Sequence, residues 1–364
     1  MGCCSECGKA GGLMYALVDC HNFYASCERV FDPSLTNKAL IVLSNNDGCV
    51  VSRSNEAKSL GIKMGVPYFQ AIPIVRDHKV KVFSSNYTLY ADLSNRVMQI
   101  LESFCPEIAI YSIDEAFLDL RAFSGVNLSQ YCRKISQSVL QYTGIPTAIG
   151  IGPSLTLAKA AQYVAKKILK VPVCALEDYP SQKKWLAHIP VGEVWGVGRA
   201  YSKRLLAMGI QTAWDLSQAN THLIRRKLSV VLARTVSELK GQPCLNFKEL
   251  ESKVVQHQVI KSRSFARPLY HLEHIEEALS HFCALAQNRL SSQGLQTKML
   301  QVFVRSRLFN IQKPYAQAAS GVLAFPSADI RVITRLAKRL LFNIYQEGVA
   351  YQKAGIILSD LYPS

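Results

Sequence analysis

The stretch that decides the fold is Ile108-Ala109-Ile110-Tyr111-Ser112-Ile113-Asp114-Glu115-Ala116-Phe117-Leu118-Asp119-Leu120. Its two short apolar runs, residues 108–113 and 116–120, predict two strands with the acidic pair Asp114-Glu115 between them. Another apolar strand is expected at residues 14–18, and Asp19 ends it. Asp19 and the acidic pair therefore each stand at the end of a predicted strand.

Further elements can be predicted outward from this stretch. Asn22 is placed to cap a helix, and Gly61 ends a helix expected at residues 55–60. Longer helices are expected at 86–104, 128–142 and 154–169, and further strands at 39–43 and 147–151. The resulting order, strand-helix, strand-strand, helix-strand, is that of a split βαβ sheet of the ferredoxin-like kind.

In such a sheet the strand that ends at Asp19 lies beside the strands that flank Asp114-Glu115, so the three carboxylates converge on one edge. Converging acids repel one another and lose hydration unless a cation joins them. Oxygen ligands with room for water and phosphate suit Mg²⁺, and two such ions would activate a 3′-hydroxyl and neutralise a leaving pyrophosphate. The alternative is structural: Asp19 caps the next helix and Asp114-Glu115 fill a solvated turn.

The second half of the chain has a different pattern. Short helical segments surround Gly196-Val197-Gly198 and Met208-Gly209-Ile210, with a polar helix at 199–207. A Gly-x-Gly turn that opens a helix can leave backbone N–H groups free to bind a phosphate. After a linker at 241–258, strands are expected at 254–264 and 300–308, and amphipathic helices at 275–290 and 330–344.

Charge divides the chain unevenly. The whole chain carries 42 Lys and Arg against 26 Asp and Glu, a net charge of +16. Residues 1–180 carry a net charge of +2, and residues 181–364 carry +14. This asymmetry favours a second half that binds nucleic acid beside a nearly neutral catalytic first half, over a surface that is basic only for solubility.

Other properties exclude several classes of protein. No apolar run approaches the roughly 18 residues of a membrane helix, and the N-terminus lacks a signal-peptide pattern, so we expect a cytoplasmic protein without membrane contact. Eleven cysteines without regular spacing favour reduced thiols. Residues 1–13 are expected to be a flexible extension ahead of a start at Met14. The cluster Cys3-Cys4-Ser5-Glu6-Cys7 could instead hold a metal, although no second ligand pair follows it.

Seven motifs, in order along residues 14–361, resemble those of the Y-family DNA polymerases, and in particular the UmuC-type branch of that family. They are residues 19–28 (DCHNFYASCE), 44–50 (SNNDGCV), 83–87 (FSSNY), 111–117 (YSIDEAF), 194–199 (VWGVGR), 262–265 (SRSF) and 351–355 (YQKAG). Seven ordered motifs over nearly the whole chain are far more specific than any one of them.

The resemblance implies an α+β, multidomain, right-hand polymerase with a ferredoxin-like palm, small fingers, a helical helix-hairpin-helix thumb and a βαβ-type little finger. Its implied activity is template-directed addition of dNTPs to a primer 3′ end, with low fidelity, in translesion synthesis during DNA repair and the SOS response. The implied limits are palm 14–22 and 86–172, fingers 23–85, thumb 173–240, linker 241–258 and little finger 259–361.

Site residues follow from the resemblance position by position. Asp19, Asp114 and Glu115 would be the catalytic carboxylates and would hold two Mg²⁺ ions, for which Mn²⁺ could substitute, with the backbone carbonyl of Cys20 completing a site. Tyr24 falls at the position of the steric gate against ribonucleotides; alternatively it packs in the core. The resemblance further implies ligands of the incoming nucleotide at Ser52, Asn55, Lys58 and Lys166, and DNA contacts at Gly196, Gly198, Arg199 and Arg263.

Three of these positions carry an alternative or a departure. Lys58 and Lys166 could instead be solvated helix surface. Asn55 stands where many members of the family have a tyrosine, so its contact with the triphosphate would be a hydrogen bond donated by the amide.

The implied partners are primer-template DNA and dNTP, and in the UmuC-type branch a UmuD-type accessory dimer, a RecA filament and a sliding clamp. The chain stops at Tyr362-Pro363-Ser364 without a Gln-x-x-aromatic clamp motif, so the tail for the accessory partners is expected to be missing. Two alternatives remain, a nucleotidyl cyclase and an inactive DNA-binding relative. The basic second half argues against the first, and the three carboxylates argue against the second.

Overall fold

A computed structural model describes residues 13–247, 250, 257–306 and 314–364. The expected N-terminal extension with its cysteine cluster, up to residue 12, lies outside the described residues, as does part of the expected linker. The chain forms two compact units, Met1–Ser252 and Lys253–Ser364, which are described separately below.

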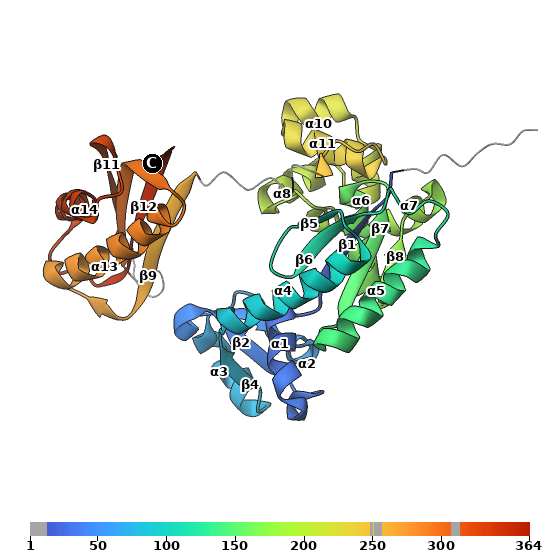
Figure 1. The fold of residues 1–364 in the computed structure, drawn as a ribbon, viewed down its shortest axis with the longest axis horizontal. Helices are drawn as coiled ribbons and strands as arrows, with labels where there is room; N and C mark the ends of the chain where they lie inside the picture. The colour runs from blue at the N-terminus through green and yellow to red at the C-terminus, as the bar shows by residue number, and fades with distance from the viewer. Residues whose placement is uncertain (1–12, 248–249, 251–256, 307–313) are drawn as a thin grey trace, which may run out of the picture. The chain divides into compact units, whose positions relative to one another are not determined.

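A five-stranded sheet forms the centre of the first unit (Figure 1). Its order is β5 (Ile108–Ile110), β6 (Glu115–Asp119), β1 (Tyr15–Cys20), β7 (Thr147–Gly152) and β8 (Val173–Ala175). The central strand β1 is antiparallel to both neighbours, and Asp19 pairs with Glu115 on one side and with Ala148 on the other. The predicted ferredoxin-like sheet is confirmed, with three differences. β1 continues through Cys20, so Asp19 lies within the strand instead of ending it. β5 ends at Ile110 and β6 begins at Glu115, so that only Asp114 of the acidic pair lies between the strands, and β8 is an edge strand that the sequence did not predict.

Helices cover both faces of this sheet. On one face, Ala16, Val18 and Cys20 pack against α4 (Tyr87–Phe104) and α5 (Leu128–Thr143). On the other face, Tyr15 and Leu17 pack against α6 (Leu155–Tyr163). Because side chains alternate along a strand, Asp19 belongs to the α6 face. The expected helix at 154–169 ends at Tyr163 and continues as the wider π-helical turn η3 (Val164–Leu169).

Two glycines of β7 let α6 lie directly on the sheet. A Cβ atom added at Gly150 would stand 2.2 Å from the carbonyl oxygen of Ala158, and one at Gly152 would stand 2.8 Å from the amide nitrogen of the same residue. Neither position can hold a side chain without moving the helix. The close approach brings the side chains of α6 and η3 to the edge where Asp19 lies.

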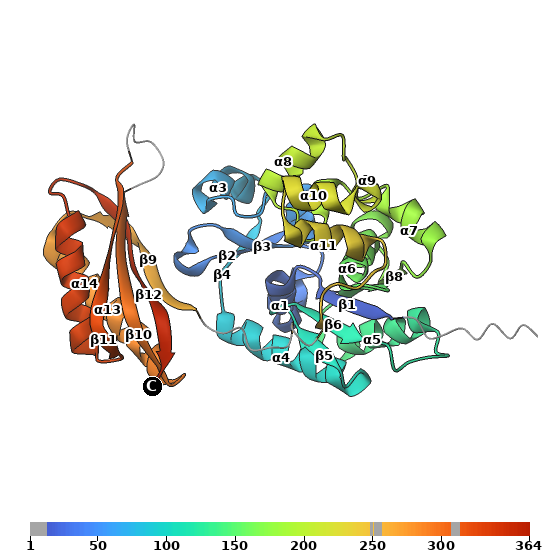
Figure 2. The same cartoon turned by 90° about the horizontal axis from the view of Figure 1, so that it is seen from above.

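A three-stranded sheet follows β1 in the chain (Figure 2). Its order is β3 (Val50–Arg53), β2 (Leu40–Leu43) and β4 (Lys81–Ser84), with β2 parallel to β4 and antiparallel to β3. The accompanying helices are α1 (Phe23–Phe31), α2 (Asn55–Ser59) and α3 (Tyr68–Asp77), with short 3-10 turns η1 (Pro33–Leu35) and η2 (Asn45–Asp47). A separate apolar core, which includes Ile41, Val50 and Ala57, holds this part together.

The helices that follow β8 share a core with α6. They are α7 (Tyr179–Leu186), the 3-10 turn η4 (Val191–Glu193), α8 (Arg199–Ala207), α9 (Ala213–Gln218), α10 (Thr221–Lys227) and α11 (Val230–Leu239). Leu157 and Ala161 of α6 belong to the same buried cluster as Leu205 and Val236. These helices therefore pack on the central sheet through α6.

Glu238, at the end of α11, is a fully buried carboxylate. Its Oε2 accepts from the Thr156 amide at 3.0 Å, and its Oε1 accepts from the amides of Cys244 and Leu245 at 2.6 and 3.1 Å. Three N–H donors compensate the cost of burying the charge. Just beyond, the buried ring of Phe247 stacks on Tyr15 with a centroid separation of 5.9 Å. The segment after α11 is thereby fixed to the central sheet.

The second unit is a four-stranded antiparallel sheet with two helices on one face (Figure 2). The strand order is β11 (Ala316–Ser327), β10 (Leu295–Ser306), β12 (Tyr351–Pro363) and β9 (Gln258–Leu269). The two predicted helices are present as α13 (Leu272–Ser291) and α14 (Ile330–Ile344), and their apolar faces pack on alternate residues of β10 and β12. The sequence does not predict β11, because Ala, Ser and Gly give its first half little of the pattern typical of a strand.

Candidate active site

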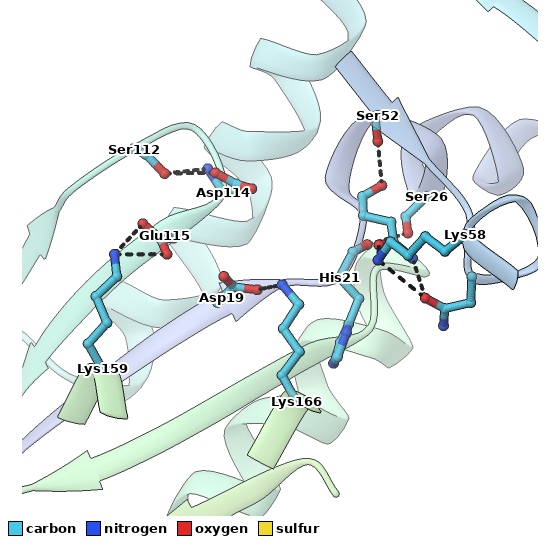
Figure 3. Close-up of polar contacts among 12 residues, drawn as sticks. Asp19, His21, Ser26, Ser52, Lys58, Ser112, Asp114, Glu115, Lys159 and Lys166 are labelled. Atoms are coloured by element: carbon cyan, nitrogen blue, oxygen red, sulfur yellow. Dashed lines mark hydrogen bonds and ion pairs between the residues drawn. The ribbon is translucent and has the colours of Figure 1, made fainter. Parts of the chain in front are cut away.

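The three predicted carboxylates meet at one edge of the central sheet (Figure 3). Asp19 and Glu115 are direct cross-strand partners, so their side chains leave the sheet on the same face. Asp114 belongs to the turn between β5 and β6, and its carbonyl accepts from the Cys20 amide at 2.9 Å. The turn itself is closed by the amides of Tyr111 and Ser112, which both donate to the Glu115 carbonyl.

Each carboxylate has a partner from a neighbouring element. Lys166 of η3 forms an ion pair with Asp19, and Lys159 of α6 donates to both oxygens of Glu115 at 3.0 and 3.2 Å. Asp114 accepts from the Ser112 hydroxyl at 2.7 Å. Lys159 is not among the site residues predicted from the sequence. Its distance of seven residues from Lys166, two helical turns, is the signal that could have found it, since both side chains then lie on one face.

Burial raises the pKa of Asp19 and of Glu115. The ammonium groups of Lys166 and Lys159 act in the opposite direction, while repulsion between carboxylates adds to the rise: the charge of Asp114 acts on Asp19, and that of Asp19 on Glu115. Carboxylates in this position gain from any further cation.

A cavity of about 460 Å³ opens beside Asp19 and Asp114. Among the predicted site residues, those that line it are Asp19, Cys20, Tyr24, Ser52, Lys58, Asp114 and Lys166. Glu115 and Asn55 do not line it. The other lining residues, which are not predicted site residues, are Asn22, Phe23, Val51, Arg53, Met64, Ile113, Gln162, Tyr163 and Lys167. The cavity thus combines two carboxylates with four basic side chains, as a site for a metal-bound triphosphate would.

The donor set fits divalent cations. Within the described residues no three His, Cys, Asp or Glu side chains stand close enough together to ligate one ion as they are. Two of the three carboxylates are instead paired with lysine ammonium groups. The amide nitrogen Nε2 of Gln162, which lines the cavity, is buried without a hydrogen-bond partner. An unsatisfied donor in this position is consistent with a ligand that carries oxygen atoms.

Tyr24 lines the cavity and belongs to an aromatic cluster. Its ring stacks on Tyr90 with a centroid separation of 4.4 Å and an interplanar angle of 16°, and it meets Tyr87 edge-on at 5.9 Å. The hydroxyl of Tyr90 donates to Glu28 at 2.6 Å, which fixes the ring beneath. Tyr24 therefore packs on the buried ring of Tyr90 and presents a half-buried ring to the cavity.

Asn22 does not cap α1 through its side chain. It has a left-handed backbone conformation, with φ of 48°, and makes no capping hydrogen bond. Its side chain instead reaches across to α2, where Nδ2 donates to Asn55 at 3.0 Å and Oδ1 accepts from Lys58. The cap prediction fails because the amide binds the neighbouring helix. Asn55 does not itself line the cavity, but it is hydrogen-bonded to Asn22, which does.

The hydroxyl of Ser52 is already engaged in the structure. It accepts from the Ala25 amide at 3.2 Å and donates to the Asn22 carbonyl at 3.3 Å, so it holds the start of α1. Lys58 faces the cavity, and burial together with the charges of Lys167, Lys166 and Arg53 lowers its pKa to about 8. A lysine in such surroundings gains strongly from an anion.

The predicted hairpin lies between η4 and α8. Gly196 has φ of 86°, a conformation that L side chains rarely adopt, and Gly198 is the N-cap of α8 without a side-chain cap. Beside it, Arg199 lines a second cavity of about 450 Å³. In the second unit, Arg263 lies on β9 with an exposed side chain.

No helix in the described parts of the chain is both long enough and apolar enough to cross a bilayer.

Comparison with known proteins gives consistent matches. A sequence model of the impB/mucB/samB family matches residues 18–163, the C-terminal domain of that family matches 256–364, and the IMS family HHH motif matches 179–210. Protein UmuC of Salmonella typhimurium is 43% identical over 353 residues, which cover 96% of this chain and 83% of the relative. DNA polymerase IV of Bacillus anthracis is 29% identical over 300 residues, 81% of this chain and 71% of the relative.

Solved structures share the fold. A Y-family DNA polymerase chimera superposes with a TM-score of 0.76 at 20% identity, over 96% of this chain and 100% of the other. The insertion ternary complex of Dbh DNA polymerase superposes with a TM-score of 0.57 at 20% identity, over the same shares of both chains.

Proposed function

This chain belongs to the impB/mucB/samB family, the UmuC-type Y-family DNA polymerases, and from that premise we propose which of its residues carry out translesion DNA synthesis. The enzyme is a DNA-directed DNA polymerase of the error-prone kind. We assign nucleotide addition to the edge of the central sheet. The single observation that carries this assignment is the cross-strand pair Asp19 and Glu115, with Asp114 beside them, against a basic cavity.

Asp19, Asp114 and Glu115 would hold two Mg²⁺ ions, which Mn²⁺ could replace, and the Cys20 carbonyl would complete one site. When bound, these ions would supply the charge that activates a primer 3′-hydroxyl and neutralises a leaving pyrophosphate. Lys166, which pairs with Asp19 and lines the cavity, would bind the incoming triphosphate. Lys58 would bind the same triphosphate. The Asn22 side chain orients its ammonium group and is itself held by Asn55, while the Ser52 hydroxyl holds the backbone carbonyl of Asn22.

Tyr24 would exclude ribonucleotides. Its ring is backed by Tyr90 and Tyr87, so it cannot retreat from a 2′-hydroxyl without disturbing that cluster. Steric exclusion requires a rigid wall, and stacking on a buried aromatic residue supplies one.

Domain roles follow as part of the proposal. We assign 14–22 and 86–172 to the palm, 23–85 to the fingers, 173–240 to the thumb, 241–258 to a linker and 259–361 to the little finger. Gly196, Gly198 and Arg199 would bind the phosphate backbone of the duplex at the start of α8, and Arg263 would contact it from the little finger. Such contacts are indifferent to sequence, which suits a polymerase that must accept any template.

The substrates are primer-template DNA and dNTPs. By analogy with its UmuC-type relatives, we further propose a UmuD-type accessory dimer, a RecA filament and a sliding clamp as partners, and a cytoplasmic, nucleoid-associated location.

Primer extension tests the proposal directly. The purified chain is offered undamaged and abasic templates with Mg²⁺, with Mn²⁺ or with EDTA. We expect extension on both templates with either metal and none with EDTA. Extension that survives in EDTA would contradict the metal assignment. Absence of extension under every condition, with and without UmuD-type protein, would contradict the proposed function.

A further inference from the structure

We propose that Lys159 is a positioning residue that fixes the carboxylate of Glu115, and that the rings of Tyr111 and Trp195 hold Lys159 in place. The inference rests on the proposed role of Glu115 as a metal ligand.

A carboxylate and two aromatic rings surround the ammonium group of Lys159. Its ammonium nitrogen donates to both oxygens of Glu115 at 3.0 and 3.2 Å. The same nitrogen stands 4.6 Å from the ring centroid of Tyr111 and 5.5 Å from that of Trp195, within the range of a cation–π contact. Three segments far apart in the sequence thus converge on one ammonium group: α6, the turn after β5 and the segment before α8.

The two rings are themselves fixed to each other. Trp195 Nε1 donates to the Tyr111 hydroxyl at 3.1 Å, and the rings meet edge-on, at 88° with a centroid separation of 5.6 Å. Phe117, which is fully buried in β6, lies 5.7 Å from each of them. A lysine side chain ordinarily keeps much rotational freedom, and a glutamate has three torsions of its own. Here both are restrained before any ligand arrives.

Lys159 and Lys166 differ in a way that separates their roles. Lys166 lines the cavity, whereas neither Lys159 nor Glu115 does. In the described parts of the chain, the cation–π contacts include Lys159 and not Lys166. Lys166 is therefore placed to exchange Asp19 for an incoming anion, and Lys159 is placed to stay. Each carboxylate oxygen has two lone pairs, so Glu115 can accept from Lys159 and still bind a metal.

A distinct kinetic signature follows for Lys159→Met. Single-nucleotide insertion at saturating Mg²⁺ should slow by about tenfold or more, the usual effect of losing a group that orients a metal ligand. The Kd for dNTP should stay within about twofold of the parent value, because Lys159 does not face the cavity. Lys159→Arg should recover most of the rate, since guanidinium keeps the charge and stacks on aromatic rings.

Metal affinity supplies a readout independent of turnover. In the free protein, without DNA or nucleotide, a fixed cation beside Glu115 repels a metal ion, so Mn²⁺ should bind Lys159→Met at least as tightly as the parent. Free Mn²⁺ can be followed by electron paramagnetic resonance. A slower rate together with undiminished Mn²⁺ affinity is the expected result. A variant that is as fast as the parent, or one that loses rate and Mn²⁺ affinity together, would overturn the proposal.

Substitution of Trp195 tests whether the aromatic rings hold Lys159 in place. Trp195→Ala should reproduce part of the rate defect, and Trp195→Phe should retain most of the rate because a ring still faces the ammonium group. The matched control is Lys184→Met, since Lys184 stands 4.7 Å from the ring of Trp185 but touches no carboxylate of the site. Its rate should equal that of the parent. A Trp195→Ala protein as fast as the parent would remove the rings from the proposal.

The same experiments separate this inference from the proposed function. If the parent does not extend a primer, the proposed function fails. If the parent extends a primer, Asp114→Ala does not, and Lys159→Met matches the parent, only the positioning role fails.

Discussion

Gly150 of β7 and Gln162 of α6 meet backbone to backbone, so closely that a Cβ atom on Gly150 would stand 2.0 Å from the Gln162 amide nitrogen. The contact leaves no flexible side chain to give way. It sets the height of α6 above the sheet, and with it the positions of Lys159 and Lys166 relative to Asp19 and Glu115.

We therefore expect Gly150→Ala to lower the free energy of unfolding by about 1–3 kcal/mol, the usual cost of overpacking, and to lower polymerase activity as well. Urea denaturation followed by circular dichroism measures the first effect. Gly48→Ala is the control, because a Cβ atom there would meet its nearest neighbour at 3.6 Å, an ordinary contact. Equal stability of the two variants would contradict the packing argument.

Removal of a metal carboxylate should separate catalysis from DNA binding. Asp19→Ala or Asp114→Ala should abolish nucleotide addition, because the metals could no longer be held. Duplex affinity should change little, since most of the positive charge lies in the second half of the chain. Primer extension and fluorescence anisotropy measure the two properties. Asp92→Ala, which removes an exposed ion pair on α4, should leave both unchanged. Extension by Asp114→Ala above a few per cent of the parent rate would refute the assignment.

Tyr24→Ala should relax sugar selectivity. Without the ring, the space that a 2′-hydroxyl needs is open, and incorporation of ribonucleotides relative to deoxyribonucleotides should rise by about tenfold or more. Tyr24→Phe should keep most of the exclusion, because the ring and its stacking on Tyr90 remain. Single-nucleotide insertion with matched rNTP and dNTP measures the ratio. Unchanged discrimination in an active Tyr24→Ala protein would place the gate elsewhere.

Nucleotide affinity should weaken in alkaline solution. The pKa of Lys58 is lowered to about 8, so in the free enzyme its ammonium form is lost as the pH rises through that value. Since the triphosphate attracts only the charged form, the Kd for dNTP should rise above about pH 8 and approach the value of Lys58→Met. Lys58→Arg stays charged throughout and should abolish this dependence. A parent Kd that is constant from pH 7 to pH 9.5 would show that Lys58 does not bind the nucleotide.

The sequence predicts the central sheet well, because its strands are short apolar runs and each acidic residue follows or interrupts such a run. The carboxylates Asp19, Asp114 and Glu115 are brought to one edge as expected. Their lysine partners are harder to predict. Lys166 is expected from the family resemblance, whereas the only sequence signal for Lys159 is its spacing from Lys166, and its contacts depend on Tyr111 and Trp195, which are distant in sequence.

Long-range contacts, polar in one case and apolar in the other, explain the other differences. Asn22 resembles a helix cap in sequence, but its amide binds α2. Division of the chain at residue 180 describes its charge but not its packing, because Leu157 of α6 and Leu205 of α8 share one core. Such long-range contacts cannot be derived from local periodicity.

The buried carboxylate of Glu238 has a consequence for protein engineering. It joins α11, the start of α6 and the segment through Leu245, and Phe247 then seals that segment onto Tyr15. A recombinant junction placed directly after α11 would separate Glu238 from the amides of Cys244 and Leu245, two of its three donors. It would also remove Phe247 from the ring of Tyr15 and leave that ring exposed. When the C-terminal unit is exchanged with that of a relative, the graft should therefore begin beyond Phe247, so that the recipient keeps its own contacts of Glu238 and Phe247.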